Sequence, residues 1–392
     1  MTNQTSWRPF LMVCFALCMG TIGTALASPL YPIYQQLWQL VPSQITAIFV
    51  AYMFGCLATL LFLGRMSNNL GYLRTLQIGI GFVILGLICS VFAHNILWLG
   101  IGRFIIGIAS GLITTSAMIG LLITIPKQYQ SHAPQFSSMI IAIGFGLGPL
   151  VGGIIAQFSQ QPLVTPYLPI ILGAFLCLIG LYFVKNPSFE KQSFSIRPRL
   201  EFPDIKYKST FLSTGLTAFV AFGIFSLFAS LAPSFIQNLI PWNGPLVSGS
   251  AIASILFISA ITQFLARSRA PQKNMQLGLI TLLMSVVLLA ICVSMQWGIL
   301  FFVSDFFVGV GHGLSLLGAF GMVHHMTHLN NRAAVVSTYL FMGYLGTIIP
   351  ILSVGYLSDH FGLTTGILTF CVVIGCLSVW LFYRFKQKPQ HM

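Results

Sequence analysis

Two stretches of ten residues decide how this chain is organised: RFIIGIASGL at residues 103–112 and DFFVGVGHGL at residues 305–314. Each begins with an ionisable residue, Arg103 or Asp305, and continues with two glycines that lie four positions apart. Apart from that first residue, both stretches are almost wholly small or apolar. Such similarity at a separation of about 200 residues indicates an internal repeat with a period of roughly half the chain.

The composition places the chain in a membrane. Of its 392 residues, 56% are hydrophobic and 6% are charged, whereas soluble domains carry about 25% charged residues. Apolar stretches long enough to cross a ~30 Å hydrocarbon core as helices recur throughout, and they are too evenly apolar for barrel strands. We predict an all-α membrane protein with twelve spans, at residues 10–30, 45–63, 76–93, 97–124, 137–158, 167–184, 211–236, 247–265, 276–294, 298–322, 335–356 and 364–383.

Prolines outside the two stretches follow the same repeat. Pro32 aligns with Pro233, and Pro149 aligns with Pro350. Two parallel repeats of six spans are typical of transporters that rock two bundles around a central site. The sequence therefore predicts two pseudo-symmetric six-helix bundles joined by a polar cytoplasmic linker, with boundaries at residues 1–184, 185–209 and 210–392.

The charge distribution predicts the topology. The chain has 18 basic and 5 acidic residues, a net charge of +13. With a cytoplasmic N-terminus, every lysine and arginine except Arg103 falls in a cytoplasmic segment, as the positive-inside rule requires. We expect an inner-membrane protein with both termini cytoplasmic, Ser193 in the cytoplasm and Asn243 outside. The basic excess serves topology and attraction to anionic lipid, so a nucleic-acid partner is excluded.

The ionisable residues inside spans are candidates for transport. In the tenth span Asp305 shares a helical face with His312, and in the fourth Arg103 shares one with Ser110 and Thr114. A charge near the centre of a span costs about 2.5–3.5 kcal/mol on insertion scales and usually faces a water-filled cavity. We expect Asp305 and Arg103 to couple protons to transport, His312 to relay protons or contact ligand, and the two hydroxyls to line a cavity. The alternative is a packing stripe of small residues near the outer boundary.

The end of the first span offers further cavity residues. The stretch SPLYPIYQQ contains hydrogen-bonding and stacking side chains suited to a small organic ligand, namely Ser28, Tyr31, Tyr34 and Gln35. Tyrosines also anchor helices at membrane interfaces, and both interpretations remain open at this point.

Glycine-rich motifs carry a resemblance to a known family. The stretch GFGLGPLVGG at residues 144–153 holds Gly144, Gly148, Pro149, Gly152 and Gly153 in the spacing of motif C of the major facilitator superfamily. Its glycines permit close helix approach and its proline permits a bend, which suits either a rocking bundle or a static interface.

A second motif departs from the family pattern. The stretch GRMSNNLGYLR at residues 64–74 resembles motif A and keeps Gly64 and Gly71, but Asn68 stands where the family has an acid. RFIIGIASG is similar to motif B, with Arg103 as its membrane-embedded arginine. The resemblance covers nearly the whole chain.

The resemblance implies a function. Motif C accompanies exporters that work as antiporters, so we expect a proton-coupled exporter of a small organic compound such as a drug, sugar or metabolite. The first span lacks the acid that many exporters of cationic drugs carry. A proton-independent facilitator or importer is the alternative. A membrane enzyme is an outside possibility, because one intramembrane acid with a histidine two turns away is a poor acid–base constellation. We expect no metal, no cofactor and no direct use of ATP, since no P-loop occurs, and we expect a monomer.

Overall fold

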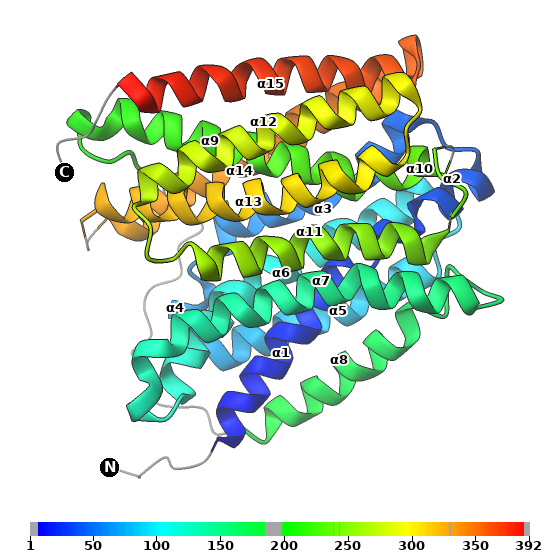
Figure 1. Ribbon diagram of the computed structural model, residues 1–392. Coiled ribbons are helices and arrows are strands. Elements are labelled where there is room, and N and C mark those ends of the chain that lie inside the picture. Colours follow the sequence, from blue (N-terminus) through cyan, green and yellow to red (C-terminus); the bar gives the residue numbers. More distant parts are fainter. Residues whose placement is uncertain are drawn as a thin grey trace. The chain divides into compact units, whose positions relative to one another are not determined.

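A computed structural model shows helices joined by turns (Figure 1). It describes residues 7–184, 198, 200–237, 239–242, 244–328 and 331–387, except for the side chains of residues 131–135, and these ranges contain no strand. Ser193, Asn243 and most of the predicted linker at residues 185–209 lie outside the described residues. The prediction of an all-α protein is confirmed.

The described helices match the twelve predicted spans. The first half contains α1 (Arg8–Ala25), η1 (Ser28–Leu30), α2 (Tyr31–Trp38), α3 (Pro42–Ala58), the π-helical turn η2 (Thr59–Leu63), α4 (Met66–Leu70), α5 (Tyr72–Val91), α6 (Ile96–Thr124), η3 (Lys127–His132), α7 (Ala133–Phe158) and α8 (Tyr167–Tyr182). The second half contains α9 (Ile205–Ser230), α10 (Ala232–Ile236), α11 (Pro245–Leu265), α12 (Pro271–Met295), α13 (Ile299–His325), α14 (Arg332–Phe361) and α15 (Leu363–Gln387). Eleven described spans are long and apolar enough to cross a membrane, and α8, with 16 residues, is a shorter apolar helix.

The first span of each half is broken at an equivalent place. α1 ends at Ala25 and α2 follows with Pro32 as its second residue, while α9 ends at Ser230 and α10 follows with Pro233 as its second residue. Proline has no backbone N–H and fits the first turn of a helix but not its interior. The aligned prolines therefore start a new helix in both halves, as the internal repeat requires.

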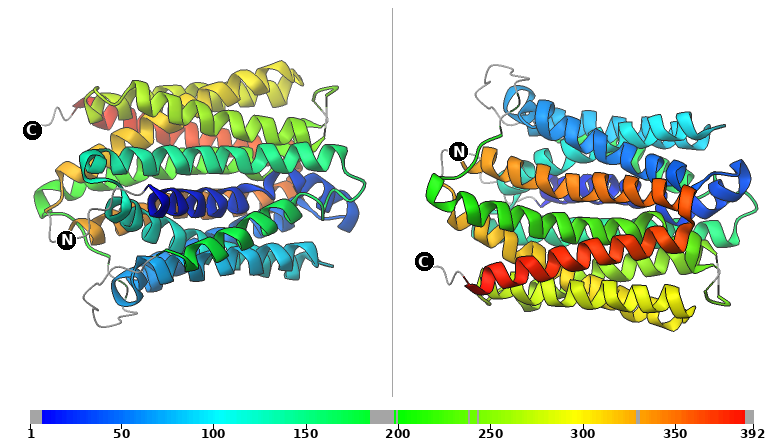
Figure 2. Two further views of the ribbon diagram at one scale, coloured as in Figure 1. Left: turned by 90° about the horizontal axis from the view of Figure 1, so that it is seen from below. Right: turned by 90° about the horizontal axis from the view of Figure 1, so that it is seen from above.

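Contacts divide the chain into two compact units. One comprises Met1–Leu30 with Ala51–Pro198, and the other comprises Tyr31–Val50 with Arg199–Met392. In the first unit α5 packs against α6 and α8, and α1 packs against α7. In the second unit the corresponding α12 packs against α13 and α15, and α9 packs against α14 (Figure 2). The two units thus repeat one packing scheme, whereas a division at the linker stays a prediction.

The glycines of motif C bring α7 against α1. Cβ atoms built on Gly148 and Gly152 would each lie 2.7 Å from a backbone carbonyl oxygen, that of Ile22 in α1 and that of Leu26 directly after it, and one on Gly144 would overlap Thr21. Only glycine permits this approach. The helix continues through Pro149, so the close packing expected from the motif is present.

Candidate functional site

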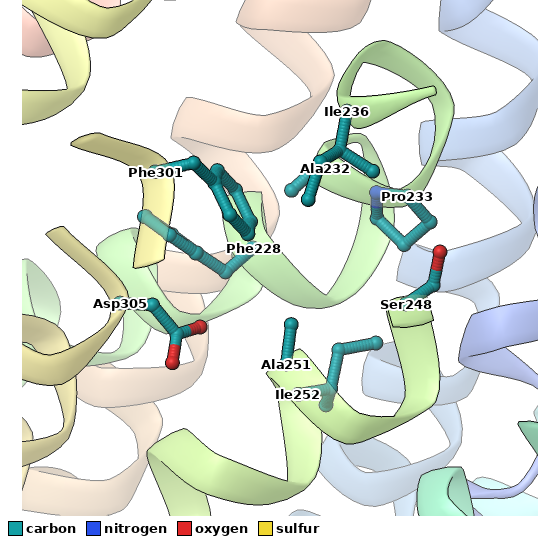
Figure 3. A pocket seen from close by; sticks show the side chains of 9 residues that line it. All are labelled: Phe228, Ala232, Pro233, Ile236, Ser248, Ala251, Ile252, Phe301 and Asp305. Carbon is teal, nitrogen blue, oxygen red and sulfur yellow. The ribbon is translucent and has the colours of Figure 1, made fainter. Parts of the chain in front are cut away.

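Asp305 lies on α13 in an apolar part of the second unit. Its side chain is 3% exposed, and the hydroxyl of Ser254 on α11 donates a hydrogen bond of 2.5 Å to Oδ2. Oδ1 has no hydrogen-bond partner among the described residues. Figure 3 shows the carboxyl group directed into a small pocket whose other lining residues are mostly apolar: Phe228, Ala232, Pro233, Ile236, Ser248, Ala251, Ile252 and Phe301.

This environment gives the carboxylate little compensation. Burial of a charged group is costly unless a counter-ion or several hydrogen bonds replace its water. Asp305 receives one hydroxyl hydrogen bond, and the ion pair found among the described residues of its unit joins His328 to Asp204 instead. Buried acids of this kind in membrane spans are typical of sites that bind protons, ions or substrate.

Arg103 lies on α6 and is almost completely buried, with 1% of its side chain exposed. Its Nη1 donates a hydrogen bond of 2.8 Å to the backbone carbonyl of Thr24 in the last turn of α1, and Nε has no partner among the described residues. The guanidinium carbon lies 5.1 Å from the centre of the Tyr52 ring on α3. Such a cation–π contact contributes about 0.5–2 kcal/mol, whereas desolvating an ion costs several kcal/mol.

The glycines beside these charges pack helices together. A Cβ atom on Gly107 would overlap the carbonyl oxygen of Tyr52 and lie 2.9 Å from the Cα atom of Gly55 on α3. In the second unit, one on Gly313 would lie 2.5 Å from the carbonyl oxygen of Ser259 on α11. The packing stripe is therefore present in both halves. The transport role of the adjacent Arg103 and Asp305 stays a prediction.

His312 has its own partner on α11. Its Nδ1 lies 3.0 Å from the Oγ atom of Ser259, and Nε2 is buried without a partner among the described residues. The rings of Phe222 and Phe225 on α9 lie 6.0 and 5.4 Å from the imidazole centre. Asp305 and His312 are thus held by different serines of one helix, and no hydrogen bond between them occurs in the described structure.

The hydroxyl groups of Ser110 and Thr114 on α6, which were predicted to line a cavity, form hydrogen bonds with nearby groups of the protein. Ser110 Oγ lies 3.2 Å from the hydroxyl of Tyr52, so Tyr52 contacts both Ser110 and Arg103. The hydroxyl of Thr114 donates to the backbone carbonyl of Ser110 at 2.8 Å. The structure therefore joins Arg103 and Ser110 in one polar cluster with Tyr52, whereas Thr114 bonds to its own helix.

The candidates at the end of the first span are mostly buried. Ser28 is 4% exposed and belongs to the first unit. Tyr31 and Tyr34, 0% and 1% exposed, belong to the second, where they contact Phe49 and Trp38 respectively, and Gln35 is half-buried. These tyrosines pack in a protein interior rather than at an exposed interface.

The residues of motif A form a short turn. Gly71 links α4 to α5 with φ = 82°, a left-handed conformation that favours glycine. Gly64 and Asn68 of this motif are exposed. Gly153, which belongs to motif C, is buried. The glycine at position 71 therefore has a local backbone reason.

Sequence reasoning missed the neighbours that hold the charged groups: Tyr52, Ser254 and Ser259. The internal repeat offered a sequence signal for two of them, because a shift of 201 residues moves Tyr52 next to Ser254 in the equivalent span. No three His, Cys, Asp or Glu side chains in the described part of the chain lie close enough to hold a metal ion.

Comparison with known proteins identifies the family. The Major Facilitator Superfamily profile matches residues 13–351. The chain is 22% identical over 235 residues to the riboflavin transporter RibZ of Clostridioides difficile (strain 630), covering 57% of this chain and 51% of RibZ. It is 25% identical over 258 residues to the quinolone resistance protein NorA of Staphylococcus aureus (strain MRSA252), covering 64% of this chain and 65% of NorA. The chain thus spans only half to two thirds of the length of these relatives.

The fold has solved counterparts. A crystal structure of a bacterial homologue of the human lysosomal transporter Spinster superposes with a TM-score of 0.73 at 14% identity, over 96% of both chains. The match of the family profile across most of the sequence agrees with the twelve helical spans. The chain belongs to the Major Facilitator Superfamily, and its helices form the multi-pass membrane fold of that family's transporters.

Proposed function

We propose that this protein exports a small organic compound across the inner membrane in exchange for protons, and that Asp305 is the group that carries the proton. In this proposal the protein works as a monomer with both termini in the cytoplasm. Arg103, the ionisable residue at the equivalent position of the other repeat, is the second residue of the proposed coupling machinery. A group that binds a proton more tightly in one conformation than in the other couples proton binding to conformation.

The environment of Asp305 is the observation that carries the proposal. A carboxyl group that is 3% exposed, with one hydroxyl on Oδ2 and no partner on Oδ1, can take up a proton without breaking an ion pair within its unit. Intramembrane acids in transporters commonly serve as proton relays. Protonation and deprotonation of such a group change the buried charge by one, which is enough to alter the balance between two conformations.

Export is supported by motif C and by relatives. The glycines of α7 lie in close contact with α1, in the arrangement that the motif-C resemblance associates with antiporters. NorA is named for quinolone resistance and RibZ for riboflavin transport, so a quinolone and riboflavin are the first compounds to test.

The test uses everted membrane vesicles in which respiration acidifies the lumen. A fluorescent dye reports the pH gradient, and compound added outside enters the lumen as protons leave. We expect wild-type vesicles to show dye recovery with a transported compound and Asp305→Asn vesicles to show none, while downhill exchange of radiolabelled compound persists. The neutral amide resembles the protonated acid and removes only the titration.

The matched control is Asp204→Asn, which removes an exposed acid of the same unit that bonds to His328. This variant is expected to behave as wild type. Normal proton exchange by the Asp305→Asn protein would show that Asp305 is structural. Transport by the wild type without any proton movement would support the alternative, a facilitator.

A further inference from the structure

The buried charge of Arg103 has no acidic partner in its own unit. The chain contains five acidic residues. Glu190 lies outside the described residues, and the remaining four belong to the second unit: Glu201, Asp204, Asp305 and Asp359. The described residues of the first unit therefore contain no acidic side chain that could neutralise the guanidinium.

The neighbours of Arg103 compensate its charge only in part. The Thr24 carbonyl that accepts from Nη1, at 2.8 Å, lies in the last turn of α1, where the carbonyl groups carry the negative end of the helix dipole. The Tyr52 ring, 5.1 Å away, adds a quadrupole but no charge. A guanidinium has five N–H donors, and the donor on Nε is buried without a partner among the described residues. The Arg103 guanidinium therefore lacks a partner with a full negative charge among the described residues of its unit.

We infer that Arg103 is the centre of a binding site for a small monovalent anion such as chloride. The site is formed by the guanidinium with the polar pair Tyr52 and Ser110 beside it, whose hydroxyl oxygens lie 3.2 Å apart. Hydroxyl and guanidinium donors are the groups that replace the water around a halide ion. A small anion suits this place better than an organic one because Arg103, Tyr52 and Ser110 are at most 7% exposed. The inference is independent of the transported compound.

The experiment measures thermal unfolding of the full-length protein, purified in detergent, at constant ionic strength. Sodium gluconate, whose organic anion is much larger than a halide ion, is replaced stepwise by sodium chloride, bromide or nitrate. A ligand that binds the folded state raises the unfolding temperature in a concentration-dependent way. We expect the three small anions to raise it and Arg103→Gln to weaken the apparent chloride affinity about tenfold or more, because a hydrogen bond to a charged group is lost.

Arg267→Gln is the matched control. Arg267 also lies over an aromatic ring, 4.2 Å from the centre of Phe264, but is exposed at the end of α11. This variant should respond to chloride as the wild type does. An equal chloride response in the Arg103→Gln protein, or no response beyond gluconate in the wild type, would overturn the inference.

A second measurement covers the case in which Arg103→Gln does not fold. Crystals of the wild type grown in sodium bromide should give an anomalous peak within hydrogen-bonding reach of the Arg103 guanidinium. Diffraction without a peak there would equally overturn the inference. Neither measurement involves proton exchange, so both are independent of the proposal for Asp305.

Discussion

Replacement of Gly107 by alanine tests the close packing on which the Arg103 cluster depends. The new methyl group would overlap the carbonyl oxygen of Tyr52 and lie 2.9 and 3.0 Å from backbone atoms of Gly55 and Cys56. None of these atoms belongs to a flexible side chain. α3 and α6 must therefore separate, which also moves the Tyr52 ring away from Arg103.

The same helix supplies the reference substitution. A Cβ atom on Gly100, seven residues earlier on α6, would meet nothing within 4 Å. Gly100→Ala should therefore stabilise the protein by about 0.5–1 kcal/mol, the usual gain for alanine over glycine in a helix. Overpacking a tight interface costs about 1–3 kcal/mol, so Gly107→Ala should be less stable than Gly100→Ala by about that amount or more.

The free energy of unfolding is measured by titrating SDS into mixed micelles and following helix content. We expect the midpoint for Gly107→Ala to fall below that of the wild type and the midpoint for Gly100→Ala to equal or exceed it. Equal stability of the two variants would refute the assignment of Gly107 to a packed interface. It would instead indicate that Gly107 borders an open cavity.

Two further predictions concern topology and gating. In a background without accessible native cysteines, Gln160→Cys should react with an impermeant external reagent and Ser268→Cys should not, because the basic loops face the cytoplasm; reversed labelling contradicts the topology. Asn68→Asp restores the acid of motif A, and an acid facing a helix N-terminus contributes about 0.3–1 kcal/mol. We expect it to favour the outward-open state and to reduce labelling of a cysteine at Thr114 from the cytoplasm about two- to fivefold, and unchanged or increased labelling would show that the latch does not operate here.

The fold was predictable because its main determinants are local. A run of about twenty apolar residues specifies a span by itself, and Pro32 and Pro233 each begin a new helix because of their own covalent structure. The internal repeat could be inferred because residues of the two halves align, for example Pro149 with Pro350. The glycines of motif C predicted a close helix approach, because small residues spaced four positions apart let lipid-embedded helices pack closely, but they did not identify α1 as the partner.

The site was less predictable because it depends on which residues of different helices lie in contact. Helical periodicity placed Arg103 and Asp305 on faces with small residues, yet it could not say whether those faces meet a cavity or a neighbouring helix. In the structure the glycines on these faces contact α3 and α11, and the charged groups reach Tyr52 and Ser254 on the same two helices. The repeat relates the position of Tyr52 to that of Ser254, but helical periodicity does not tell which residues of two separate spans lie side by side.

The two proposals concern residues of opposite charge, Arg103 and Asp305, at equivalent positions of the repeat. Each of these two residues is buried in an environment that compensates its charge incompletely: Arg103 has a carbonyl and a ring, and Asp305 has a hydroxyl. Two ligands can complete the compensation: an anion on Arg103 and a proton on Asp305. An anion and a proton bring opposite charges into the apolar interior of the protein, so each lowers the electrostatic cost of binding the other. Binding of two ligands to one equilibrium is reciprocal. Chloride should therefore raise the apparent proton affinity of the transport cycle, and protons should raise the apparent affinity for chloride by the same factor.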